Sequence, residues 1–132
     1  MVGMHLVPAE HAHRHPIDEH RVCEAIEAIG ETQRVEQWAG RFALLADPGR
    51  LRLLLAIAAC PEISVTDLAI AAAMNDTAVS QALRLLRVAD AVTARKDGRV
   101  MRYQISDPTI SALLTQIRPS PQPARAQHNA HP

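Results

Sequence analysis

Polar side chains recur at helical spacing between residues 77 and 87. Hydroxyl, amide and guanidinium groups follow one another at offsets of 0, 3, 4, 7 and 10 residues and therefore project from one face of a helix. They are Thr77, Ser80, Gln81, Arg84 and Arg87. The opposite face is apolar, with Val79, Leu83 and Leu86. Such polar groups bond base edges and phosphates in a DNA major groove, but this helix alone leaves open a merely solvated face.

The segments on either side of this helix favour DNA. Before it, a capping-box pattern at residues 64–67 opens a short helix, and a break at residues 74–75 separates the two helices as in a helix-turn-helix. After it, residues 91–95 and 100–105 alternate with a period of two around Asp97-Gly98, which predicts a β-hairpin. Cations surround the tip of that hairpin, namely Arg95, Lys96, Arg99 and Arg102.

A recognition helix followed by a basic wing predicts a winged helix that binds double-stranded DNA. We expect four side chains to read the groove: Thr77, Ser80, Gln81 and Arg84. We expect four others to hold phosphates: Arg87, Lys96, Arg99 and Arg102.

The remaining elements surround this unit. Helical periods with a stop at Gly30 and capped starts at Asp47-Pro48 and Asp107-Pro108 give five helices, a hairpin and a last helix. The fold class is therefore mainly α with a β-hairpin wing. We expect a mobile His-containing arm over residues 1–17, the winged-helix and dimerisation domain over 18–118, and a disordered Pro-rich tail over 119–132.

Four sequence blocks resemble the ArsR/SmtB family of bacterial winged-helix repressors, in that family's order and spacing. The blocks are FALLADPGRLRLL at 42–54, VTDLA at 65–69, TAVSQALRLLR at 77–87 and DGRVMRY at 97–103. The resemblance covers about residues 20–117. It implies a homodimer built through the N- and C-terminal helices. Such a dimer releases operator DNA when a metal ion, metalloid or oxidant acts on its sensor site.

Two residues depart from the family pattern. Ala73 stands at the helix-turn-helix break where the family usually has glycine, and an alanine in the left-handed conformation there carries about 1–2 kcal/mol of strain. Ala82 follows Gln81 where another polar side chain is frequent.

Histidines gather near the N-terminus, and imidazole binds Zn, Ni, Co and Cu. The resemblance implies a sensor site that joins the arm to the first helix of the helix-turn-helix across the dimer. Its predicted ligands are His20 and Asp67, supplemented by His13 or His15. Because Ser64 replaces the family's usual thiolate, this His/carboxylate set fits Zn, Ni or Co as inducer. The alternatives are a capping role for Asp67 and a surface position for His20. The family's second site, between C-terminal helices, lacks its ligands, so Asp107 is expected only to cap a helix.

Cys23 and Cys60 offer a different sensor. A thiol pair could respond to oxidants if the two Cα atoms lay within about 7 Å, whereas two small buried side chains are the alternative. Cys23 could also join His20 in a mixed metal site. A third hypothesis is a His-rich metal buffer that does not bind DNA.

Charge and composition limit the remaining choices. The chain has 14 basic and 14 acidic residues, yet residues 77–106 carry six bases against two acids, and this separation indicates a polyanionic partner. The longest apolar run, residues 53–60, is too short to span a bilayer, and no secretory signal is evident. Two cysteines indicate a reducing compartment, so we expect a cytoplasmic location. We predict no enzyme, because the patterned core has no histidine, nucleophile–base pairing or phosphate-binding glycine loop.

Overall fold

The computed structural model describes residues 15–119, which form two compact units divided between Ala43 and Leu44. The sequence contains further residues, among them His13 and most of the predicted arm and tail, that lie outside the described range. No helix within residues 15–119 is long and apolar enough to cross a membrane.

The first unit is helical and has no buried side chain in either helix. It contains α1 (Glu19–Ile29) and most of α2 (Thr32–Leu45). The Asp18 carboxylate accepts a hydrogen bond from the Arg21 backbone N–H at the start of α1, and Gly30, with φ of 74°, ends it as predicted. In α2 the Trp38 and Phe42 rings lie 5.7 Å apart. The apolar stripes predicted for these helices exist, but within one chain they stay largely exposed.

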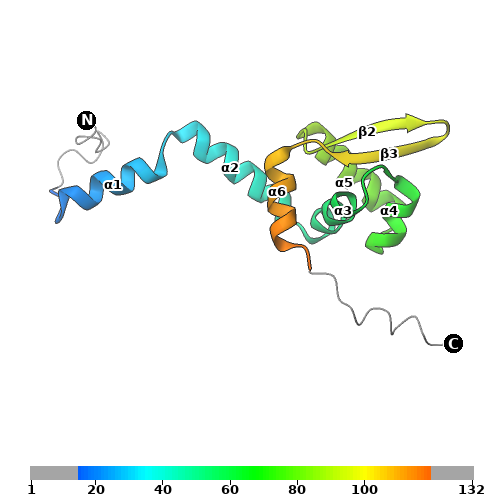
Figure 1. Ribbon diagram of the computed structural model, residues 1–132, viewed down its shortest axis with the longest axis horizontal. Helices are drawn as coiled ribbons and strands as arrows, with labels where there is room; N and C mark the ends of the chain where they lie inside the picture. The colour runs from blue at the N-terminus through cyan, green and yellow to red at the C-terminus, as the bar shows by residue number, and fades with distance from the viewer. Residues whose placement is uncertain (1–14, 120–132) are drawn as a thin grey trace, which may run out of the picture. The chain divides into compact units, whose positions relative to one another are not determined.

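The second unit has the predicted order of elements with one addition. It comprises α3 (Pro48–Ala59), β1 (Ile63–Ser64), α4 (Val65–Ala72), α5 (Asp76–Val88), β2 (Val92–Asp97), β3 (Val100–Ile105) and α6 (Pro108–Ile117) (Figure 1). The sequence pattern does not predict the two-residue strand β1. It extends the hairpin to a three-stranded antiparallel sheet of order β1-β3-β2, with Ile63 opposite Tyr103.

Side-chain caps start all four helices of this unit. The capping oxygens belong to Asp47, Ser64, Asn75 and Asp107. Between these helices the core is aliphatic, and its most deeply buried side chains are Leu53, Leu54, Ile57, Leu68, Val79, Leu83, Leu86, Ile110 and Leu114. Tyr103 is the aromatic member of the cluster within the described residues. The core thus fixes which face of α5 turns outward.

The turn between α4 and α5 forces an alanine into the left-handed region. Ala73 has φ of 56° and ψ of 47°, and the next amide, on Met74, donates to the Ala69 carbonyl in a 3.1 Å bond. This geometry closes the end of α4 and turns the chain into α5. The strain expected for a non-glycine residue at the break is therefore present.

Replacing Ala73 by glycine is expected to stabilise the protein by about 0.5–1 kcal/mol. The relieved left-handed strain exceeds the entropy that glycine adds to the unfolded chain. The free energy of unfolding from a urea titration measures the difference. Ala71→Gly, at an exposed helical position of α4, is the control and is expected to destabilise by about 0.5–1 kcal/mol. Destabilisation by both variants would contradict the assignment of strain to Ala73.

Candidate nucleic-acid interface

Helix α5 presents the predicted polar face to solvent. Asn75 caps the helix by accepting from the Ala78 N–H at 2.8 Å, and this starts the register that buries Val79 and Leu83. The five polar side chains predicted for the opposite face are all exposed: Thr77, Ser80, Gln81, Arg84 and Arg87. Within residues 15–119, Arg84 and Arg87 make no ion pair. Their guanidinium groups are therefore available to an external anion.

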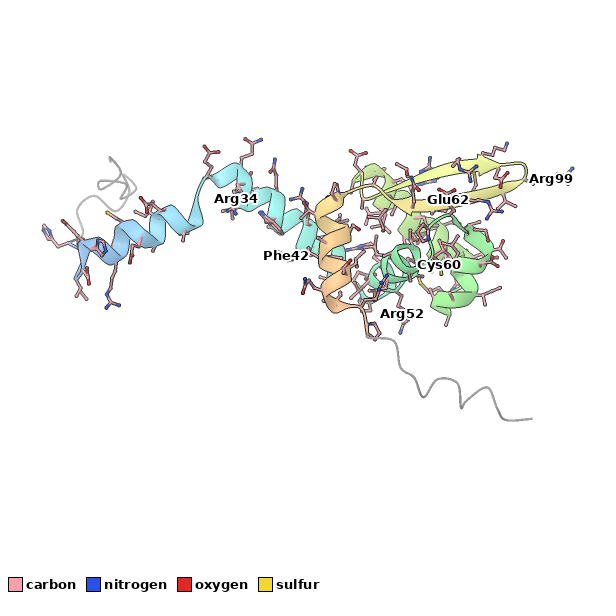
Figure 2. All side chains as sticks on the ribbon, viewed as in Figure 1. Arg34, Phe42, Arg52, Cys60, Glu62 and Arg99 are labelled. Carbon is pink, nitrogen blue, oxygen red and sulfur yellow. The ribbon has the colours of Figure 1, made fainter. Side chains whose placement is uncertain are left out.

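The wing is longer than the sequence pattern indicated. Strand β2 continues through Lys96 and Asp97, so that Asp97 pairs with Val100 and the two-residue turn is Gly98-Arg99. Gly98 takes the positive φ of 64° required at the first turn position, whereas Arg99 keeps a negative φ. Arg99 therefore lies at the tip of the hairpin, at its far end from the helices (Figure 2).

Two of the four wing cations are paired with carboxylates. Arg95 and Arg102 lie directly opposite one another on β2 and β3, an arrangement that repels. Arg95 donates to Glu62 Oε1 at 2.6 Å and 3.0 Å. Arg102 donates to Asp97 Oδ2 at 2.8 Å and, from its other end, to the Glu62 carbonyl at 3.1 Å.

In each pair the pKa of one partner is shifted. The hydrogen bond and charge of Arg102 lower the pKa of the Asp97 carboxyl below its ordinary value. The hydrogen bond and charge of Glu62 raise the pKa of Arg95. The Asp97 carboxylate is therefore ionised near neutral pH and neutralises Arg102.

The pairing changes the expected roles of the wing cations. Lys96 and Arg99 have no ion pair among the described residues and stay exposed. Arg102, predicted to hold a phosphate, is partly buried and ties β3 to the loop before β1. The cations of the wing that are open to an external anion are therefore Lys96 and Arg99 at its tip, whereas Arg102 is held by its partners.

Sequence reasoning missed Glu62. This residue adopts a left-handed backbone, with φ of 69°, and its amide donates to the Tyr103 carbonyl at 2.9 Å. Its side chain meets Arg95, 33 positions later, and no local pattern signals such a pair. An acid beside Pro61 reads in sequence as an ordinary loop residue.

Replacing Asp97 by asparagine is expected to increase affinity for DNA about two- to fivefold at low salt. The substitution is isosteric, removes a negative charge from the wing and leaves Arg102 with a net charge for phosphates. Fluorescence anisotropy across a salt series measures the change, which should shrink as salt increases. Asp90→Asn is the matched control, because Asp90 lies near the other end of β2, about 20 Å away along the strand. An unchanged or weaker Asp97→Asn complex would contradict the role assigned to this pair.

The candidate metal ligands occupy both units. His15 and His20 are exposed in the first unit, where His20 Nε2 lies 3.7 Å from the Glu24 carboxylate one turn later. In the second unit Asp67 is exposed on the first turn of α4, where its backbone N–H donates to Ser64 Oγ. Its carboxylate has no partner among the described residues. No three His, Cys, Asp or Glu side chains within residues 15–119 of one chain form a metal-binding group.

Neither cysteine forms a disulfide within the described residues, and the two lie in different units. Cys23 is partly buried in α1, and Cys60 is exposed at the end of α3 (Figure 2). The alternative of two buried apolar side chains is thus wrong for Cys60. Its exposure leaves it open to reagents.

A helix-turn-helix followed by a cationic hairpin defines the class of winged-helix DNA-binding domains. No family model matches the chain. It is 39% identical over 84 residues to the transcriptional repressor SmtB homolog of Synechocystis sp., covering 64% of this chain and 63% of that protein. It is 36% identical over 86 residues to the HTH-type transcriptional regulator NmtR of Mycobacterium tuberculosis, covering 65% and 71%.

A solved structure agrees with these sequence matches. The crystal structure of AntR, an antimony-specific transcriptional repressor, superposes with a TM-score of 0.61 at 28% identity, covering 83% of this chain and 87% of that one. The chain belongs to the ArsR/SmtB family, and its fold is a winged helix. The match spans less than two-thirds of the Synechocystis protein. All three relatives are named as transcriptional repressors or regulators, in agreement with the expectation that the chain is not an enzyme.

Proposed function

We propose that this protein is a homodimeric transcriptional repressor that releases operator DNA when it binds a divalent transition metal. The observation that carries the proposal is the exposed polar face of α5, in the same unit as a wing with Lys96 and Arg99 at its tip. Within residues 15–119 neither these two cations nor Arg84 and Arg87 of α5 make an ion pair. These groups suit base edges in the major groove and phosphates beside it. Because its ligand would be chromosomal DNA, we place the protein in the cytoplasm.

A second copy of the chain would cover apolar side chains that a single chain leaves exposed. Ile29 of α1, Phe42 of α2 and Ile117 of α6 are each more than half exposed. A lone helix that exposes such a stripe gains stability by burying it against a partner. Dimerisation through the terminal helices would cover these side chains and present two α5 helices to successive half-sites.

Release of DNA by a metal is supported by the chemistry of the exposed ligands and by the similarity to AntR, which is named an antimony-specific repressor. His20 and Asp67 are exposed, and the carboxylate of Asp67 has no partner within residues 15–119, so that His13 or His15 could complete a set across the dimer. Imidazole with carboxylate suits Zn, Ni or Co. A metal that binds better to the conformer with low DNA affinity would shift the dimer away from DNA by that difference in affinity.

The test is fluorescence anisotropy with a labelled duplex from the gene's own upstream region. The expected result is tight binding in chelator and release by one of Zn, Ni or Co. Release by oxidant alone would move the sensor to the exposed thiol of Cys60 and to Cys23. No binding in any state, together with metal uptake that survives deletion of the wing, would overturn the proposal in favour of a metal buffer.

Exchange of both His20 and Asp67 for alanine is expected to abolish metal-driven release. DNA binding without metal should persist, because neither side chain belongs to the DNA-binding face. The control exchanges two other imidazoles, His128 and His131, which should leave release intact. A normal metal response of the His20/Asp67 variant would show that the ligands lie elsewhere.

A further inference from the structure

The second unit has a groove beside α5 in which one polar side chain, that of Tyr103, has no role in the assignments above. The groove has a volume of about 450 Å³. Its walls come from the start of α4, from α5 and from β3: Val65, Ser80, Leu83, Arg84, Arg87, Val88 and Tyr103. It therefore lies between the predicted recognition helix and a strand of the wing.

The charge of the groove is positive. Arg84 and Arg87 line it, no carboxylate does, and neither arginine has an ion pair within residues 15–119. Asp76 lines a separate, smaller depression, which shares Val65 and Ser80 with the groove. Two unpaired guanidinium groups on one wall favour an anion.

A buried hydroxyl without a partner gives the second observation. Tyr103 is only 7% exposed, yet its hydroxyl has no hydrogen-bond partner among the described residues. The other wall-forming residues from the core, Val65 and Leu83, are apolar and cannot supply one. Buried hydroxyl groups are normally paired, and a ligand in the groove that Tyr103 lines would supply the missing acceptor.

We propose that this groove is a phosphate-binding site, in which Tyr103 donates a hydrogen bond to a phosphate oxygen that Arg87 neutralises, while Arg84 adds positive charge to the same wall. Ser80, exposed and without a hydrogen-bond partner in the described part of the chain, is the second hydroxyl donor. This inference rests on the proposed function for the source of the phosphate. When α5 lies in a major groove and the wing in the adjacent minor groove, the DNA strand between the two grooves passes the gap between α5 and β3.

The experiment combines the variant Tyr103→Phe with duplexes in which single phosphates are replaced by neutral methylphosphonates. The variant keeps the ring in the core and removes only the hydroxyl. We expect it to bind native operator about tenfold more weakly, as for a lost hydrogen bond to a charged group, with an unchanged salt dependence. At one phosphate position, the neutral methylphosphonate should weaken DNA binding by the native protein but should not further weaken DNA binding by Tyr103→Phe. Arg87→Ala should instead reduce the salt slope by about one.

Two controls separate the possible outcomes. Thr93→Val removes a hydroxyl from β2 outside the groove and should bind like the native protein. The second control titrates inorganic phosphate without DNA and follows the protein by NMR. If phosphate causes chemical-shift changes that Tyr103→Phe abolishes, and if no methylphosphonate position distinguishes the native protein from the variant, the site binds a soluble phosphate instead of DNA. Native DNA binding with no effect of Tyr103→Phe in either arm would overturn the inference and leave the proposed function intact. Failure of the native protein to bind DNA would contradict the proposed function, and the phosphate titration would still decide the site.

Discussion

Simultaneous replacement of Ser80, Gln81 and Arg84 by alanine is expected to reduce affinity for operator DNA by about 100-fold or more. All three side chains are exposed on one face of α5, where an amide and a guanidinium are each worth about 1–3 kcal/mol in base discrimination. Alanine is the best helix former, so the variant should keep α5 intact. Anisotropy with operator and with an unrelated duplex measures the loss, and the two affinities should converge.

The matched control removes one arginine from another helix of the same unit. Arg52 is exposed on α3, which lies below the hairpin in the view of Figure 2. Arg52→Ala should leave the affinity for operator within about twofold and should not change the ratio of specific to nonspecific binding. An equal loss in both variants would mean that general positive charge, rather than the α5 face, binds the DNA.

The order of elements was predictable because local chemistry specifies it. Asp47 and Asp107, each followed by proline, cap α3 and α6 as expected, and Gly30 ends α1. The apolar period that buries Leu83 in α5 also determines which side chains face outward. Wherever a helix is amphipathic and capped, sequence suffices to place its functional face.

Contacts between distant segments were not predictable. The strand β1 exists because Ile63 pairs with Tyr103, 40 positions later, and two residues carry no period of their own. For the same reason the sequence does not predict the pairing of Arg95 with Glu62. Together with the pair of Arg102 and Asp97, this pairing neutralises half the cations of the wing. A count of charges in a hairpin cannot tell a free arginine from one held by a carboxylate.

The metal site shows a different limit. The family resemblance predicts His20 and Asp67 as ligands. The structure shows that both are exposed, that His20 lies beside Glu24, and that the Asp67 carboxylate has no partner among the described residues. A site shared between two protomers has no local pattern in a single sequence. Its ligands remain a proposal, which the double exchange tests directly.

Replacement of Leu86 by alanine is expected to destabilise the protein by about 3–4 kcal/mol. Leu86 is fully buried in the cluster that holds α5 against the rest of the second unit. The substitution loses the transfer free energy of the side chain and leaves a cavity under the recognition helix. Urea titration measures the free energy of unfolding, and DNA binding should weaken near the lowered unfolding temperature because α5 is no longer held in place.

Leu85→Ala is the matched control, since the same atoms are removed one position away. Leu85 is 45% exposed, so its loss should cost less than about 1 kcal/mol. The two positions differ by about 100° around α5, and their comparison therefore reports which face the helix buries. If Leu85→Ala were the more damaging change, α5 would be rotated from the register described. The side chains assigned to DNA would then turn toward the core, and the assignment of Gln81 and Arg84 would fail with it.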